Sequence, residues 1–281
     1  MNDCDAADTI TRLKRISTEL RKSLLTLIHK AGDGHPGPSL SVADLVTTLY
    51  FHEMRIDPKN PQWEDRDRFL LSKGHACSCL YAALAKLGYF SEDLLPGFRS
   101  LGSFLQGHPV MDKVPGVDMT TGTLGHGLSV GAGMAAAGRL GKKDYRVYVI
   151  LGDGELNEGI VWEGVQVAAN MKLANLTVFV DLNGYQSGGR TDEVSGINAI
   201  PVVRKFESFG WKTIEIDGHD YGQIMAALAE AKAETRRPTM IVAKTVKGKG
   251  VPYMENNNAW HKGVPNKQQL AEALQSLEVV A

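Results

Sequence analysis

The chain has 281 residues, which is enough for one large α/β domain or two ordinary ones. Its 31 lysines and arginines nearly balance its 32 aspartates and glutamates, so a formal charge of −1 excludes a strong electrostatic attraction to nucleic acid or an anionic membrane. Glycine makes up 30 residues, about a tenth of the chain against an average of roughly 7%, as in enzymes with many tight ligand-facing loops.

Cysteine usage and the N-terminus indicate a soluble protein of the cytoplasm. The three cysteines, Cys4, Cys77 and Cys79, cannot all pair, and their spacing lacks the two-residue gap of zinc and redox motifs. The acidic N-terminus has no apolar stretch of the signal-peptide type, and no segment reaches the roughly 18 apolar residues of a membrane span. We therefore expect free thiols and no membrane partner.

The beginning of the chain predicts two helices joined by a loop rich in glycine and proline. Apolar residues recur every three or four positions over 10–28, which is the pattern of an amphipathic helix, and the glycines at 32–34 should end it. Ser41 is placed as an N-cap, with Asp44 three positions later, for a second helix reaching about His52.

From residue 69 onward, predicted strands alternate with predicted helices. The strands cover 69–72, 146–151, 176–181, 212–216 and 240–245. The helices cover 76–87, 127–138, 160–173, 202–209 and 221–235. This alternation predicts an α/β fold with a mostly parallel sheet and helices on both faces. We expect a single domain over 1–281 with an irregular loop at about 246–266, and ligand binding beyond the carboxyl ends of the strands.

A carboxylate and an amide follow two of these strands. Asp153 lies in Gly152-Asp-Gly-Glu155 after the strand at 146–151, and Asn183 follows the next strand thirty residues later, the length of one βαβ unit. If the two strands pair, about 4.8 Å apart, the two side chains emerge as neighbours. Such oxygens can share one hard cation, and Mg²⁺ leaves coordination positions for phosphate and water. The spacing favours a magnesium and phosphate site.

Histidines form a second group of candidate residues. Five of the eight directly follow a glycine: His35, His75, His108, His126 and His219. Imidazoles on loops near a strand-end crevice can bind phosphate and sugar hydroxyls or carry protons near neutral pH. Their spacing lacks the short intervals of a zinc site. His219, before a helix, is interpreted as part of a cap.

One motif suggests a different cofactor but lacks its context. Gly32-Asp-Gly-His-Pro-Gly37 matches G-x-G-x-x-G, yet a long helix precedes it where a dinucleotide-binding fold has a strand. A nicotinamide or flavin site is therefore disfavoured.

The ordered motifs resemble the diphosphate-binding N-terminal part of transketolase, and the stand-alone N-terminal subunit of the split form of that enzyme. The matching segments begin at Lys30, Ser72, Gln106, Thr121, Gly152, Asn183, Lys244 and Trp260. They extend over nearly the whole chain, from near residue 10 to near residue 275.

The resemblance implies a thiamine diphosphate fold, an activity and the residues that carry it. The activity is transfer of a two-carbon ketol unit from a ketose phosphate to an aldose phosphate, with thiamine diphosphate and Mg²⁺, or Ca²⁺ or Mn²⁺ in its place. The metal ligands are Asp153, Asn183 and the main-chain oxygen of Tyr185. The cofactor-binding residues are His75, Gly122, Leu124, Gly154, Glu155, Asn183 and His261. The catalytic residues are His35, His108 and His261. Arg99 would stand at the substrate entrance.

The chain departs from the family pattern at four positions and in its length. The usual residues are replaced by Thr123, His126, Gly188 and Lys262, and His126 would add an imidazole beside the cofactor. The resemblance implies that a second domain of the family supplies the glutamate that activates the cofactor and the groups that grip the sugar phosphate, and we do not expect this chain to contain that domain. We therefore expect a separate C-terminal subunit, in an α2β2 heterotetramer.

Three other functions remain open. A deoxyxylulose-phosphate-synthase-like enzyme shares the scaffold, and the α subunit of a 2-oxoacid dehydrogenase shares the paired Asp153 and Asn183. The histidines His35 and His108 favour transketolase over both. A non-catalytic relative would be expected to have lost these residues, and all are present.

Overall fold

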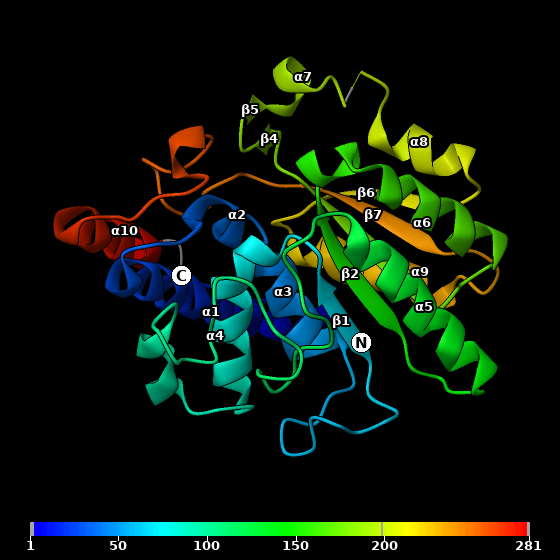
Figure 1. The fold of residues 1–281 in the computed structure, drawn as a ribbon, viewed down its shortest axis with the longest axis horizontal. Helices are drawn as coiled ribbons and strands as arrows, with labels where there is room; N and C mark the ends of the chain where they lie inside the picture. The colour runs from blue at the N-terminus through cyan, green and yellow to red at the C-terminus, as the bar shows by residue number, and fades with distance from the viewer. Residues whose placement is uncertain (1–2, 198, 280–281) are drawn as a thin grey trace.

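The computed structural model describes residues 3–197 and 199–279, which build a layered α/β fold around one parallel sheet (Figure 1). The sheet has the order β1-β2-β3-β7-β6 and all four strand pairs are parallel. Its strands are β1 (Arg68–Leu71), β2 (Val147–Gly152), β3 (Leu176–Leu182), β7 (Thr239–Lys244) and β6 (Lys212–Asp217). The predicted strands are confirmed, with ends that differ by at most one residue.

Helices cover both faces of the sheet, as predicted. On one face lie α1 (Asp3–Ala31), α3 (Ala43–Thr48), α4 (Cys77–Leu87) and α9 (Tyr221–Ala233). On the other lie α5 (His126–Leu140), α6 (Gly159–Asn170) and α8 (Val202–Ser208). Successive strand residues point to opposite faces, so Tyr148 and Ile150 join the first core while Val147 and Val149 join the second. Burial on both faces explains why the strands are continuously apolar.

The remaining elements are short or peripheral. They include α2 (Pro36–Ser41), a π-helical turn that continues α3 (Leu49–Glu53), the hairpin of β4 (Tyr185–Gln186) and β5 (Gly189–Arg190), α7 (Thr191–Val194), α10 (Lys267–Val279) and several 3-10 turns. The hairpin, α7 and α10 were not predicted. Apart from a 3-10 turn at Asn258–Trp260, residues 245–266 form no helix or strand, which agrees with the irregular loop expected there. No described helix combines the length and apolar content needed to cross a membrane.

The predicted N-cap at Ser41 is wrong. Ser41 is the last residue of α2, and α3 begins at Ala43 after Val42, which forms no side-chain cap. The Ser41 hydroxyl is buried and donates to Asp181 Oδ2 at 2.7 Å, while Asp44 pairs with Arg21 at 2.6 Å. Both polar side chains serve long-range contacts because a buried carboxylate requires charged or hydrogen-bonding partners.

Candidate functional site

A cavity of about 680 Å³ opens at the carboxyl ends of the central strands. All of the predicted catalytic, cofactor-binding and metal-binding residues line it: His35, His75, His108, Gly122, Leu124, Asp153, Gly154, Glu155, Asn183, Tyr185 and His261. They come from loops that follow β1, β2, β3 and β7 and from the loops that precede α2 and α5. The fold therefore assembles residues from both ends of the chain at one edge of the sheet.

Asp153 and Asn183 are neighbours because β2 and β3 pair in register, with Gly152 opposite Asp181. Asp153 Oδ1 accepts the Gly154 N–H at 2.9 Å and Oδ2 accepts the Gly184 N–H at 2.6 Å. Asn183 Oδ1 accepts the Tyr185 N–H at 3.1 Å. The Gly154 N–H, predicted to bind the diphosphate, is thus engaged by Asp153 in this structure and would have to be shared with a ligand.

Within the part of the chain that the structure describes, no cation lies within hydrogen-bonding distance of the Asp153 carboxylate. It is 1% exposed, and burial together with the nearby charge of Asp181 raises its pKa to about 7, although the N–H groups of Gly184 and Gly154 oppose that rise. A buried carboxylate in this state gains most from a bound cation. Among the described residues, no three or more His, Cys, Asp or Glu side chains are grouped to hold a metal, so amide and main-chain oxygens would have to complete the coordination.

Asp181, at the end of β3, orients Asn183. Asn183 Nδ2 donates to Asp181 Oδ2 at 2.8 Å, so the amide oxygen is turned away from Asp181 and toward the β3–β4 loop. Asp181 also accepts from Ser41, Thr245 and the Lys73 ammonium. Although burial raises the pKa of Asp181, the Lys73 charge and these donors hold it below its usual value. Sequence reasoning missed this carboxylate, which lies inside an otherwise apolar strand.

Glu155 lines the cavity, but its carboxylate supports the protein chain. It accepts from the Ser72 hydroxyl, from the Gly125 N–H at 2.6 Å and from the Gly152 N–H at 3.0 Å. These bonds tie the end of β2 to the loop that carries Leu124. Its predicted contact with a cofactor stays a prediction, and its observed role is to shape that loop.

Three imidazoles meet on one side of the cavity. The ring centroids of His35 and His75 are 5.1 Å apart, and that of His261 lies 5.7 Å from His35 and 5.4 Å from His75. Burial, helped by nearby cations, lowers the pKa of His35 to about 4 and that of His261 to about 3. Burial also lowers the pKa values of His75 and His108. All four imidazoles are therefore neutral near pH 7 and can each donate and accept a hydrogen bond.

Lys247 is a site residue that sequence reasoning missed. It is 1% exposed, and its ammonium donates to Asn258 Oδ1 at 2.8 Å and lies 2.9 Å from His261 Nδ1. Burial and the charge of Lys73 lower its pKa to about 8. Its position just beyond β7, at the same edge of the sheet as Asp153, is a signal that could have identified it.

Several predicted features lie outside the cavity lining. His126 begins α5 and is half-buried, with Nδ1 3.2 Å from the carbonyl of Leu124, which itself lines the cavity; the expected imidazole beside the cofactor stays a prediction. Arg99 is also absent from the lining and pairs with Asp33 at 2.8 Å, which Lys262 approaches at 3.4 Å. His219 does not cap α9, because Asp220 occupies that position; it contacts Asp44 instead.

The free thiols agree with the prediction where side chains are described. Cys77 and Cys79 are free and buried, and burial raises the pKa of each to about 12. The side chain of Cys4 lies outside the described residues.

Comparison with known proteins identifies the architecture. Residues 13–278 match the family model described as transketolase, thiamine diphosphate binding domain. The chain superposes on transketolase from Leishmania mexicana with a TM-score of 0.89 at 32% identity, and on that from Campylobacter jejuni with 0.89 at 33%. Each superposition covers 95% of this chain but only 41% and 42% of the solved chains. The chain therefore spans about two fifths of these transketolases.

Two relatives are similar over nearly their full length. One is a subunit of the apulose-4-phosphate transketolase of Phocaeicola vulgatus, which is 38% identical over 268 residues, covering 95% of this chain and 94% of the relative. The other, the 6-deoxy-6-sulfo-D-fructose transketolase subunit SqwG of Clostridium sp. (strain MSTE9), is 40% identical over 266 residues, covering 95% and 96%. The chain thus belongs to the transketolase thiamine diphosphate-binding family, and in extent it matches single transketolase subunits.

Proposed function

We propose that this chain is the N-terminal subunit of a two-chain transketolase, which moves a two-carbon ketol unit from a ketose phosphate to an aldose phosphate. The observation that carries the proposal is the single cavity in which Asp153 and Asn183 face a cluster of neutral histidines. The near-complete match to two transketolase subunits supports it.

Mg²⁺ is the proposed metal, and the donor set fits it. Among the described residues, no cation lies within hydrogen-bonding distance of the buried Asp153 carboxylate, and the Asn183 amide oxygen, turned away from Asp181, keeps a lone pair besides the one that accepts the Tyr185 N–H. Hard oxygen donors in small number are what Mg²⁺ takes when substrate phosphates complete its shell. Asp153, Asn183 and the Tyr185 main-chain oxygen would hold the metal, and the metal would hold the cofactor diphosphate.

Thiamine diphosphate, when bound, supplies the carbon centre that takes up and releases the two-carbon unit. The chain positions hydrogen-bonding groups around it. Because the Lys247 ammonium donates to His261 Nδ1, the proton of that neutral imidazole lies on Nε2, where it can be donated to a sugar hydroxyl. His35 Nδ1 is buried and has no hydrogen-bond partner among residues 3–197 and 199–279, which leaves it free to bind or move a substrate proton.

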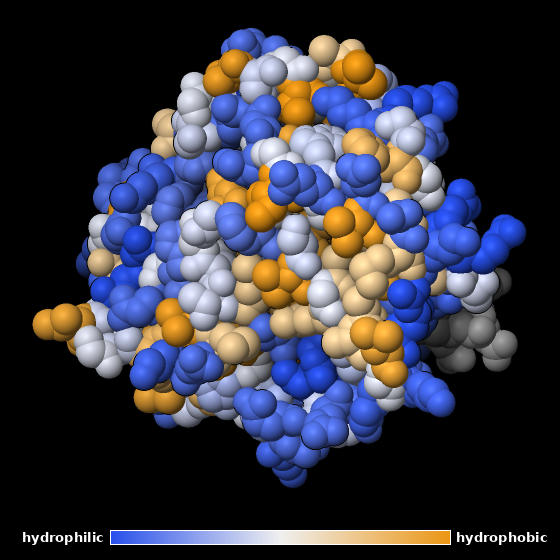
Figure 2. Space-filling model, turned by 45° about the vertical axis from the view of Figure 1, so that its right-hand side comes forward, coloured by the Kyte–Doolittle hydropathy of each residue, from blue (hydrophilic) through white to orange (hydrophobic). Residues whose placement is uncertain are grey.

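A separate C-terminal subunit is the proposed partner, in an α2β2 assembly. The solved transketolases that this chain matches are more than twice its length. An exposed stripe of α5, formed by Val130, Gly133, Ala137 and Leu140, is apolar or small, and α6 also exposes an apolar side chain, Val167. Figure 2 shows apolar side chains gathered toward the centre of one face of the molecule. Such a surface supports assembly with other chains.

We also propose that the complex works in the cytoplasm.

Reconstitution with the product of a neighbouring gene tests the proposal. With thiamine diphosphate and Mg²⁺, the pair should transfer a ketol unit, whereas this chain alone should show no turnover. The donor panel should include xylulose 5-phosphate, apulose 4-phosphate and 6-deoxy-6-sulfofructose, because relatives or their structures carry these names. Activity with pyruvate in place of a ketose donor would favour the deoxyxylulose-phosphate-synthase-like or 2-oxoacid dehydrogenase alternatives. Full activity of this chain by itself would contradict the proposed partner.

A further inference from the structure

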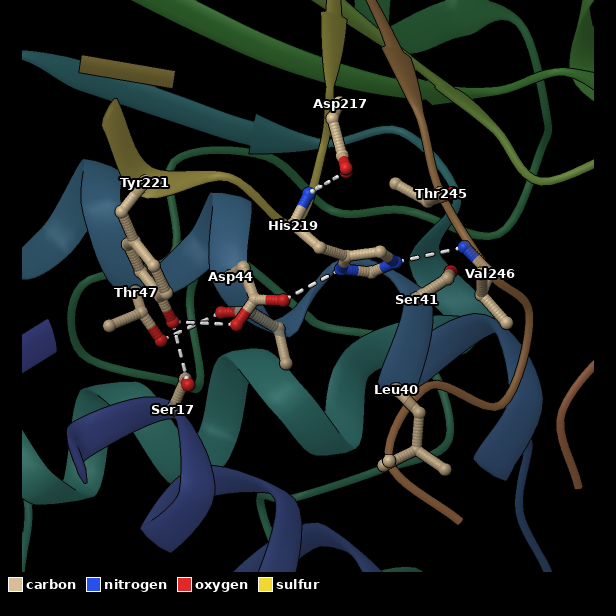
Figure 3. A network of polar contacts seen from close by, with 12 residues as sticks. Ser17, Leu40, Ser41, Asp44, Thr47, Asp217, His219, Tyr221, Thr245 and Val246 are labelled. Atoms are coloured by element: carbon tan, nitrogen blue, oxygen red, sulfur yellow. Dashed lines mark hydrogen bonds and ion pairs between the residues drawn. The ribbon is translucent and has the colours of Figure 1, made fainter. Parts of the chain in front are cut away.

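A buried polar network connects α1, α3, α9 and the chain beyond β7, and its members Ser17, Asp44, His219, Tyr221 and Val246 are not among the residues that line the cavity (Figure 3). His219 lies at its centre with a side chain that is 11% exposed. Its Nδ1 is 2.7 Å from Asp44 Oδ2, and its Nε2 accepts the Val246 N–H at 2.9 Å. The imidazole therefore bridges a helix carboxylate and the main chain of the loop that follows β7.

The His219 bridge lies just beyond the last paired residues of β6 and β7. The register of β6 and β7 runs to Asp217 opposite Lys244, and the Gly218 N–H still donates to the Lys244 carbonyl at 2.8 Å. Beyond that point the chain after β6 turns into α9, so its carbonyls no longer reach the chain after β7. The His219 ring then supplies the acceptor for the Val246 N–H that a neighbouring strand would otherwise supply.

The partners of His219 determine its tautomer. Burial raises the pKa of Asp44, but the Arg21 charge and the hydrogen bonds from His219 and Arg21 outweigh that effect and hold the pKa well below its usual value. Asp44 is therefore an acceptor, so His219 Nδ1 carries the proton. The Val246 N–H is a donor, so Nε2 carries the lone pair. The neutral ring satisfies both contacts only in this tautomer.

Val246 begins the segment that supplies two side chains to the cavity. Lys247 is the next residue, and it holds His261 through the contact of Nζ with Nδ1. We propose that His219 is a positioning residue that fixes the 246–261 segment, and thereby Lys247 and His261, against the body of the domain. The effect on cofactor binding rests on the proposed function, whereas the effect on the segment itself does not.

Amide hydrogen exchange of the full chain, followed by mass spectrometry of peptides covering 246–261, measures this directly. His219→Asn retains a donor for Asp44 but is too short to reach Val246, so exchange at the start of the segment should become roughly three- to tenfold faster, the loss of one hydrogen bond. His219→Gln places an oxygen near the position of Nε2 and should restore much of the protection. Tyr221→Phe is the matched control, since it removes a 2.6 Å hydrogen bond to Asp44 Oδ1 and leaves His219 in place.

Thiamine diphosphate affinity in the presence of Mg²⁺ is then measured on the wild type and the variants, each reconstituted with the proposed C-terminal subunit. Faster exchange in His219→Asn with weaker cofactor binding supports both the positioning role and the proposed function. Faster exchange in a protein whose wild type binds no thiamine diphosphate supports the positioning role and contradicts the proposed function. Equal exchange rates in His219→Asn and His219→Gln would overturn the positioning role. An increase in exchange in Tyr221→Phe as large as that in His219→Asn would also overturn it. Thermal unfolding of each variant identifies a general loss of stability.

Discussion

The ends of β2 and β3 both carry a buried aspartate, and the two sites are built in opposite ways. Asp181 is 0% exposed and has a lysine, two hydroxyls and an amide as partners, which hold its pKa low despite burial. Asp153 is 1% exposed and accepts only main-chain N–H groups among the described contacts, so burial raises its pKa to about 7. The described residues thus provide a cation, Lys73, that neutralises Asp181, and none in contact with Asp153.

This difference separates a carboxylate with a structural role, Asp181, from one that is suited to bind a ligand, Asp153. A buried charge that is compensated internally stabilises the arrangement around it, and removing one partner is strongly destabilising. A buried charge without a cation lowers stability until a ligand supplies one. Asp181 thus supports Asn183 and the strand ends, and Asp153 is available for a metal.

The largest effect is expected from breaking the Asp181 and Lys73 pair. Lys73→Met or Asp181→Asn each leaves a buried partner uncompensated, and each should lower the free energy of unfolding by about 3–5 kcal/mol. The double variant should lose less than the sum of the two. Urea unfolding of the four proteins completes the double-mutant cycle, and strictly additive losses would show that the two side chains do not form a coupled pair.

Substitution of His108, on the cavity wall, should reduce activity while leaving the stability of the fold unchanged. His108 is half-buried and neutral near pH 7, so it is placed to handle substrate hydroxyls and protons. In the reconstituted enzyme, His108→Ala should lower kcat/KM for ketol transfer by about 100-fold or more with little change in cofactor affinity. Similar losses in both quantities would place His108 among the cofactor-binding residues instead.

The comparison also predicts that replacing aspartate with asparagine changes the free energy of unfolding differently at positions 153 and 181. At pH 8, Asp153→Asn should keep the free energy of unfolding of the ligand-free chain within about 1 kcal/mol or raise it, because it removes an uncompensated charge. The same variant should lose the Mg²⁺ dependence of thiamine diphosphate binding. Urea unfolding and calorimetric titration with and without EDTA test the two statements. A destabilisation as large as that of Asp181→Asn would remove the distinction.

The smallest effect is expected in the pH dependence of stability. The pKa of His35 is lowered from 6.5 to about 4, so between these values the unfolded chain binds more protons than the folded one. The free energy of unfolding should therefore fall as pH falls from 6.5 to 4. In His35→Asn, the free energy of unfolding should change less steeply with pH over this range. The decrease in slope should correspond to a fraction of one bound proton, because the ring is partly exposed. Chemical unfolding of the ligand-free proteins at several pH values measures it, and an unchanged slope would mean that His35 is protonated equally in both states.

Much of the site was predictable because its residues stand at recognisable places. Asp153, Asn183 and the glycine-linked histidines follow strands or glycines, and parallel pairing brings strand ends together. Lys247 and Asp181 were missed because one lies past a strand and the other inside one, where local patterns show only a lysine and a strand residue. Ser41 and His219 were misassigned as caps, because a local hydrogen-bonding role cannot be distinguished from a long-range one without the partner.

The sequence by itself determined the order of strands and helices, the apolar faces and the residues that belong to the family motifs, since these depend on local spacing and side-chain chemistry. Only the tertiary structure decided which carboxylate is neutralised, which way the Asn183 amide points and which tautomer His219 adopts. Those properties depend on charges and donors contributed by distant segments, and on the low polarity created when these segments pack together.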